Sequence, residues 1–300
     1  MASPIAARAP QKRSHARAGF IALCTVPALV LYALFVVYPT VQVFYMSLFR
    51  STSLGLDKQF VGLSNFIALF KDSKFLVSLG NQFFFIIVVT IITMACSMFF
   101  AALLTQSNLR EKPFYRTVFF FPNVLSMVII SMLFVQMYDP SHGILNAILG
   151  LFGIKGHTWL GEDATVLWCI AFAMVWQAIG YYMVMYMSGM DSISKELYEV
   201  ADLEGMGKFK QFFKITLPLM WEVVRVTIVF FIISTINMSF TFVNIMAPAK
   251  VFVPTTYMYN QAFQQNNYGF AMCASTVMFI ISFLLALLSN KLTARDTVEH

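Results

Sequence analysis

The chain has 300 residues, of which 59% are hydrophobic and only 11% are charged, and its mean hydropathy is +0.74. A soluble domain of this length needs far more polar surface, so a water-soluble globular fold is excluded. The formal net charge of +6 reflects the distribution of Lys and Arg around a membrane and not nucleic-acid binding. The four cysteines lie within apolar segments without CxxC spacing, so neither a disulfide framework nor a metal site is predicted.

Several apolar segments are long enough to cross the hydrocarbon core, which takes roughly 20 helical residues. They lack the alternation of barrel strands, so we predict an all-α, polytopic membrane protein with six transmembrane helices. In chain order the predicted spans are 19–38, 80–105, 115–137, 165–188, 220–243 and 268–290. The first span can continue past Pro39 toward Phe49, because proline kinks a membrane helix without forbidding it.

Lys and Arg orient these spans. If the N-terminus is inside, 14 of the 20 basic residues fall on the cytoplasmic side and 6 on the other side. We therefore predict that both termini are cytoplasmic. The domain organisation is then a basic tail at 1–18 held near anionic lipid head groups, a permease domain at 19–290 and a tail at 291–300.

Three polar segments are expected on the outer side. Residues 50–79 and 139–164 are predicted to form short interfacial helices, and 246–267 combines prolines, tyrosines and glutamines that suit contact with a soluble partner.

A charge-dense block lies between the fourth and fifth spans, within a cytoplasmic loop at about 189–219. It comprises Glu199-Val-Ala-Asp-Leu-Glu-Gly205, nine residues, and Ile215-Thr-Leu-Pro218. Ser192 or Ser194 can cap a helix that starts near Lys195, and Gly205 can end it in the left-handed conformation. Because so short a helix is marginal by itself, it needs a partner. An ordinary solvated loop that obeys the positive-inside rule is the alternative.

The second part of the block has an apolar stripe of Phe209, Phe212 and Phe213. Lys208, Lys210 and Lys214 flank the stripe, which predicts an amphipathic helix at the inner interface leading to Pro218 and the fifth span.

This block resembles the signature loop of the inner-membrane permease subunits of binding-protein-dependent ABC importers. That loop has Glu-Ala-Ala, three residues, Gly, nine residues and Ile-x-Leu-Pro. Val200 replaces the middle Ala, and Glu204 replaces the usual Asp before Gly. The matching residues are Glu199, Ala201, Gly205, Ile215, Leu217 and Pro218.

Other segments resemble the carbohydrate-uptake branch of that family, which is MalF-like or glycerophosphate-permease-like. They are Val61–Phe66, Gly143–Asn146, Trp159-Leu160 and Tyr259–Phe263 followed by Tyr268-Gly269. One departure is Asn244-Ile-Met-Ala-Pro248, where the family usually carries Gly-Gly-Pro, so the contacts of the outer loop can differ.

The resemblance implies a type I ABC importer permease fold in the bacterial inner membrane. It implies partnership with a second, homologous permease, two copies of an ATP-binding subunit and an extracytoplasmic solute-binding protein that delivers a sugar. The helix near Lys195 would be the coupling helix, with Glu199 in a charge pair with the ATPase and Gly205 permitting close approach. The sequence has no GxxxxGK[ST] phosphate loop, so no catalytic residue and no cofactor are assigned to this chain.

Polar side chains at mid-membrane depth are costly and often functional. Asn and Gln hydrogen-bond to sugar hydroxyls, while Trp and Tyr present flat apolar faces. Each of the candidates is equally compatible with packing between helices. Asn81 and Asn123, near span ends, are interpreted as caps or interfacial residues. The candidate pathway residues are Trp176, Gln177, Tyr181, Ser234, Thr235, Asn237 and Ser239.

Two alternatives remain at this point. One is a permease of the same family for a non-carbohydrate solute such as glycerol phosphate. The other is an ion-coupled secondary transporter, which is disfavoured because such transporters usually need an intramembrane carboxylate or broken helices. Here Glu222 and Arg225 lie only at the inner end of the fifth span.

Overall fold

The computed structural model describes residues 15–52, 57–106 and 110–293. This part of the chain is almost entirely helical, which confirms the all-α prediction. Two short strands, β1 (Phe49–Arg50) and β2 (Gln59–Phe60), pair antiparallel with Phe49 opposite Phe60. In chain order the helices are α1 (His15–Tyr32), η1 (Ala33–Val37), α2 (Tyr38–Met46), α3 (Ser64–Leu69), α4 (Ser73–Gln106), α5 (Lys112–Val124), α6 (Met127–Met137), α7 (Ile144–Leu151), α8 (Asp163–Asp191), α9 (Lys195–Leu203), α10 (Lys208–Gln211), η2 (Phe212–Thr216), α11 (Leu217–Leu219), α12 (Trp221–Met246), α13 (Pro254–Tyr259), η3 (Asn260–Gln264) and α14 (Tyr268–Thr293).

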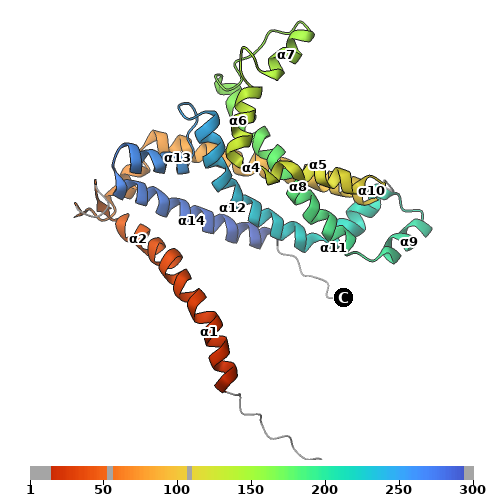
Figure 1. Ribbon diagram of the computed structural model, residues 1–300, viewed down its shortest axis with the longest axis horizontal. Coiled ribbons are helices and arrows are strands. Elements are labelled where there is room, and N and C mark those ends of the chain that lie inside the picture. The colour runs from red at the N-terminus through yellow and green to blue at the C-terminus, as the bar shows by residue number, and fades with distance from the viewer. Residues whose placement is uncertain (1–14, 53–56, 107–109, 294–300) are drawn as a thin grey trace, which may run out of the picture.

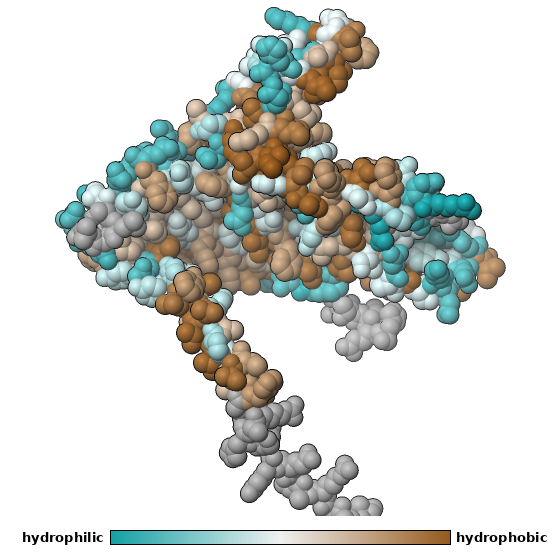
Figure 2. All heavy atoms as spheres, viewed as in Figure 1, coloured by the Kyte–Doolittle hydropathy of each residue, from teal (hydrophilic) through white to brown (hydrophobic). Residues whose placement is uncertain are grey.

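Five helices or continuous helical runs are individually long and apolar enough to cross a membrane. They are Phe20–Met46, Ser73–Thr105, Asp163–Asp191, Trp221–Met246 and Tyr268–Lys291. In Figure 2 the hydrophilic residues gather toward the two ends of the body, with hydrophobic residues between them. The first span continues through Pro39 as predicted, and α4 begins at Ser73, earlier than the predicted start at residue 80.

The third predicted span, 115–137, is not one continuous helix. It consists of α5 and α6, which meet at 96°, so six spans result only if this bent pair counts as one. Pro122 lacks an N–H for the helical ladder, and Leu125 leaves the helix with ψ 148°. Ser126 then caps α6, because its hydroxyl accepts a hydrogen bond from Val128 N at 3.3 Å. Proline and the new cap together explain the break.

Helix α8 is the centre of the bundle, where it packs on α4, α5 and α12 (Figure 1). Among its fully buried side chains are Met174, Met183 and Tyr186. The Tyr186 hydroxyl lies 2.9 Å from Thr227 Oγ1 on α12. Ser97 on α4 donates a hydrogen bond to Ile179 O on α8 at 2.8 Å. Close packing and such interhelical bonds hold membrane helices together, because lipid supplies no hydrophobic drive.

Two arms project from this bundle in Figure 1: α1 in one direction, and α6 with α7 in another. The apolar window of the Phe20–Met46 span has no buried residue, although Phe44 near its end packs edge-on against Phe279 of α14. On the other arm Leu151 and Phe152 are 84% and 76% exposed. Within the described part of the chain, both arms therefore present apolar faces without a protein partner.

The end of the bundle that carries α13 is tied together by polar contacts. Asn65 donates from Nδ2 to Ser47 O at 2.9 Å and to Phe49 O at 3.0 Å, which fixes α3 to the segment after α2. Tyr257 donates its hydroxyl proton to Asp72 Oδ2 at 2.6 Å. Burial raises the pKa of Asp72, but the Tyr257 hydroxyl and two backbone amides outweigh that effect and lower it.

Candidate functional site

The polar block between α8 and α12 folds as the local signals predict. Helix α9 starts after Ser194, whose hydroxyl accepts from Glu196 N at 3.3 Å. Its C-terminal end has the two bonds of a Schellman motif, from Gly205 N to Asp202 O at 3.0 Å and from Met206 N to Ala201 O at 2.9 Å. Gly205 has φ +71°, the left-handed region that glycine adopts without steric cost.

Helix α9 is only half covered by its own chain. Ala201 is 4% exposed and faces the body, whereas Leu197, Val200 and Leu203 are 45%, 56% and 89% exposed. Glu199 is exposed as well. Nothing covers this apolar side in the described residues, so this part of the chain does not supply the partner that a short helix needs.

A polar latch closes the loop after α9. Lys208 Nζ lies 2.9 Å from both carboxylate oxygens of Asp202, and Gln211 Nε2 donates to Asp202 Oδ1 at 2.5 Å. Gln211 also donates to Met206 O at 2.8 Å. The hydrogen bonds from Lys208 and then Gln211 lower the pKa of Asp202 below its ordinary value.

This latch predicts an acid-sensitive loop. The pKa of Asp202 is lower in the folded loop than in an unfolded one. The contribution of its ionised carboxylate to the stability of the loop is therefore complete above the unfolded pKa of about 3.9, and it is lost as pH falls below that value. We expect amide hydrogen exchange in 203–208 to accelerate, beyond the intrinsic pH effect, below about pH 4. Asp202→Asn should show the faster exchange already at pH 7. Equal protection of this variant and the wild type at pH 7 would contradict the latch.

The second half of the motif lies in the segment 212–219, which leads into α12 and which we call the foot of α12. Ile215 lies in η2, and Leu217 and Pro218 lie in α11, a single turn before α12. Thr216 is buried, and its Oγ1 is 2.8 Å from the Tyr198 hydroxyl of α9. This contact joins α9 to the segment that leads into α12.

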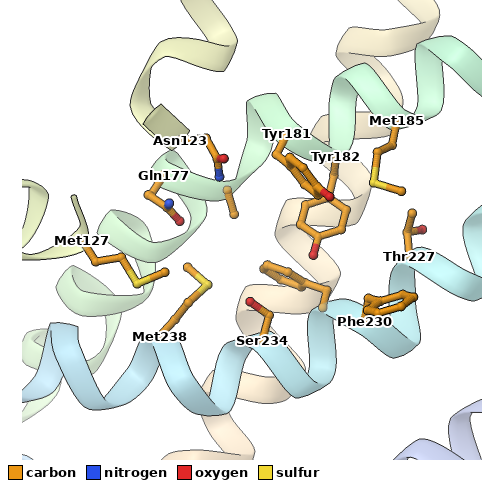
Figure 3. A pocket seen from close by; sticks show the side chains of 12 residues that line it. Asn123, Met127, Gln177, Tyr181, Tyr182, Met185, Thr227, Phe230, Ser234 and Met238 are labelled. Carbon is orange, nitrogen blue, oxygen red and sulfur yellow. The ribbon is translucent and has the colours of Figure 1, made fainter. Parts of the chain in front are cut away.

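A cavity of about 370 Å³ lies between α5, α8 and α12, and we call it the central cavity (Figure 3). Three of the predicted pathway residues line it: Gln177 and Tyr181 from α8, and Ser234 from α12. Asn123 from α5, which the sequence suggested as a cap or interfacial residue, also lines it. Asn123 lies one residue before the end of α5, and the bend to α6 follows after Val124.

The other four candidates lie elsewhere. The ring of Trp176 packs on Phe134, with centroids 5.5 Å apart. Thr235 Oγ1 donates to Phe231 O within its own helix at 2.8 Å. Ser239 is buried and donates to Gln82 Oε1 of α4 at 2.8 Å. Asn237 lines a separate cleft beside α13.

Several cavity residues were missed from the sequence although a helical signal existed. Thr227, Phe231, Ser234 and Met238 recur at intervals of four, three and four residues, so they share one face of α12. On α8, Tyr182 adjoins Tyr181 on the same side of the cavity. The helical face of the predicted Ser234 would have found Thr227, Phe231 and Met238, and the predicted Tyr181 would have pointed to its neighbour Tyr182.

The described residues that line the central cavity include no Asp, Glu, Lys, Arg or His. Its polar groups are amides and hydroxyls, and the rest are aromatic rings, methionines and an alanine. No group of three or more His, Cys, Asp or Glu side chains in the described ranges could hold a metal ion. The chemistry of the cavity is therefore that of neutral hydrogen bonding and ring stacking.

Comparisons with known proteins identify the family. Residues 99–295 match the family described as "Binding-protein-dependent transport system inner membrane component". The chain is 37% identical over 279 residues to the probable ABC transporter permease protein YurN of Bacillus subtilis, covering 90% of this chain and 94% of that protein. It is 29% identical to the diacetylchitobiose uptake system permease protein NgcF of Streptomyces coelicolor, covering 91% and 82%.

The fold is also that of solved permeases. A chain of the bacterial alginate ABC transporter, in complex with an alginate pentasaccharide-bound periplasmic protein, superposes with a TM-score of 0.86 at 19% identity. The match covers 94% of this chain and 96% of that one. It supports the predicted type I importer permease fold. The chain therefore belongs to the family of inner-membrane components of binding-protein-dependent transport systems, and it is a membrane-spanning permease subunit of an ABC importer, not an enzyme.

Proposed function

We propose that this permease carries a neutral sugar or oligosaccharide, which contacts the amides and hydroxyls of the central cavity. The observation that carries the proposal is the uncharged, aromatic and amide-rich lining of that cavity. Sugar hydroxyls both donate and accept hydrogen bonds, as the side chains of Asn123, Gln177 and Ser234 do. The rings of Tyr181 and Tyr182 offer apolar faces to the CH face of a sugar.

The same lining disfavours glycerol phosphate as the solute. Similar proteins include the sn-glycerol-3-phosphate permease UgpA of Salmonella typhimurium, at 26% identity, as well as NgcF, so similarity alone does not separate the two solutes. Phosphate groups in proteins are usually held by Arg, Lys or helix N-termini. The described cavity lining has no cation, and it also has no carboxylate for ion coupling.

We assign coupling to the ATP-binding subunits to the end of the bundle that carries α9. Glu199 is proposed to pair with a cation of an ATP-binding subunit, and the exposed Leu197, Val200 and Leu203 to fill an apolar cleft on it. Gly205 ends the coupling helix, and the foot that contains Ile215, Leu217 and Pro218 passes the movement to α12. This end faces the cytoplasm in our proposal, because the loops that hold most Lys and Arg lie there.

The assembly we propose has this chain beside a second, homologous permease, with two ATP-binding subunits and a solute-binding protein at the α13 end. Both termini are cytoplasmic and the membrane is the bacterial inner membrane. The two apolar arms support a permease partner, because a laterally projecting pair such as α6 and α7 suits an adjacent membrane protein. Thr235, Ser239 and Trp176 are assigned to helix packing in this assembly.

The test is ATP-driven uptake by the assembled transporter in proteoliposomes, with its binding protein, of radiolabelled maltose, diacetylchitobiose, raffinose or glycerol 3-phosphate. Gln177→Leu removes one amide from the cavity and should raise the KM for the transported saccharide by about tenfold. This change corresponds to a loss of roughly 1.4 kcal/mol of binding free energy. Gln136→Leu is the matched control, because Gln136 is exposed on α6 outside the cavity. Size exclusion should show that this variant retains the permease pair.

Vanadate should stop this uptake, and an ionophore should leave it unchanged. Uptake of glycerol 3-phosphate but of no saccharide would overturn the solute class. Uptake that persists in vanadate and collapses with the ionophore would contradict ATP-driven transport.

A further inference from the structure

A second cavity of about 400 Å³ lies between α12, α13, η3 and α14, at the α13 end of the bundle. We call it the outer cleft and define it by Asn237, Phe240, Thr255, Tyr259, Phe263 and Tyr268. None of these residues lines the central cavity. Within the described chain, the outer cleft is likewise lined by no charged side chain.

Aromatic rings form a continuous series along the outer cleft. The centroids are 5.9 Å apart for Phe240 and Tyr259, 5.1 Å for Tyr259 and Phe263, and 6.3 Å for Phe263 and Tyr268. Tyr259 and Phe263 are nonetheless 44% and 63% exposed. Ring surface is therefore left open to a ligand, and such surface stacks on flat apolar groups.

Two polar groups of the outer cleft lack partners in the described structure. Thr255 Oγ1 is buried and makes no hydrogen bond. The Asn237 side chain is exposed on α12, and its amide makes no hydrogen bond to the described residues. A buried hydroxyl without a partner is unfavourable, so a ligand that bonds to it gains affinity.

The backbone around the outer cleft is irregular. Residues Asn260–Gln264 form the π-helical turn η3, and Asn266 has φ +52°, which is uncommon for a residue other than glycine. Both features are frequent at functional sites. Here the π-helical turn carries Phe263, one of the exposed rings.

The outer cleft and the central cavity lie on neighbouring faces of α12. Asn237 is the direct sequence neighbour of Met238, which lines the central cavity, so the two cavities occupy adjacent faces of the same helical turn. The outer cleft lies nearer to α13, and thus on the side where we place the binding protein. A solute passing from that side to the central cavity would meet it first.

We propose that the outer cleft is a second saccharide-binding site of this permease, where an uncharged sugar ring stacks on Tyr259 and Phe263 and hydrogen-bonds to Asn237 and Thr255. The inference rests on the proposed function and deepens it, because two sites in sequence suit an oligosaccharide of more than one ring. The outer cleft receives the ring released by the binding protein, and the central cavity receives it next.

The test uses the assembled transporter with its binding protein and the same saccharide panel. Asn237→Leu with Tyr259→Ala should raise the KM for saccharide uptake by about tenfold, while ATP hydrolysis without binding protein stays unchanged. Tyr259→Phe keeps the ring and should retain the wild-type KM. Tyr115→Ala is the matched control, since Tyr115 is 39% exposed on α5 and lines neither cavity.

An unchanged KM in the double variant overturns the outer site and leaves the central cavity intact. Loss of the permease pair on size exclusion with this variant also overturns it, and assigns the cleft to a subunit contact. If the wild type transports only glycerol 3-phosphate, both saccharide assignments fail together. If Gln177→Leu impairs saccharide uptake and the double variant does not, only the outer site fails.

Discussion

Gly205→Asp is expected to lower transport at least about tenfold while the protein remains inserted in the membrane. The glycine ends α9 at φ +71°, and no atom of the described chain outside its immediate neighbours lies within 4 Å of an added Cβ. The conformational cost to an ordinary L-residue there is about 1–2 kcal/mol, too small to unfold the bundle. A new carboxylate beside the ATPase contact should instead prevent close approach. We expect uptake to fall at least about tenfold, with ATP hydrolysis no longer stimulated by the binding protein.

Gly207→Asp provides the matched control for this prediction. Gly207 lies in the same loop, also has open space around an added Cβ, and has an ordinary φ of −63°. Membrane insertion and thermal stability in detergent should be similar for the two variants, whereas uptake should fail only for Gly205→Asp. Wild-type uptake by Gly205→Asp would remove this loop from the coupling mechanism.

Gly180→Ala should have the largest effect on stability. A Cβ at Gly180 would overlap the carbonyl group of Phe119 and the backbone of Phe120, so α5 would have to move away from α8. Overpacking of this kind typically costs about 1–3 kcal/mol, and the cost is higher where the backbone must move. We therefore expect Gly180→Ala to lower the free energy of unfolding by about 3 kcal/mol or more. Since α5 also carries Asn123 into the central cavity, we expect both a lower Tm in detergent and loss of saccharide uptake.

Gly80→Ala is the control for that substitution. Gly80 lies inside α4, and an added Cβ would meet nothing within 4 Å, so this change should be neutral or stabilise the helix by up to about 1 kcal/mol. Equal Tm values for Gly180→Ala, Gly80→Ala and the wild type would show that α5 and α8 are not held at close contact.

The α9 loop could be predicted almost residue by residue, because its signals are local. A serine cap, a short amphipathic stretch and a glycine at the helix end act over a few residues, and each formed as expected at Ser194, Ala201 and Gly205. Spacing could not predict the salt bridge of Lys208 with Asp202, since it depends on how the chain turns after the helix.

The pathway residues were predicted only in part. Gln177, Tyr181 and Ser234 meet at the central cavity, but polar residues on neighbouring faces of the same helices point elsewhere. Depth in the membrane can be estimated from position along a span, whereas the rotation of a helix about its axis is fixed by its neighbours. Asn123 shows the limit most clearly, because its place in the cavity depends on how α5 packs on α8 and not on a local pattern.

Composition and span lengths by themselves determined that this is a helical membrane protein, and the gapped block from Glu199 to Pro218 pointed to a permease with an ATPase partner. These properties follow from short-range physics: the length of an apolar helix, its caps and the spacing of a loop motif. Only the tertiary structure decided that 115–137 is bent, which side chains share a cavity, and that a second cleft opens beside α13. Those features arise from contacts between helices far apart in the sequence, for which no local pattern fixes the rotation or angle.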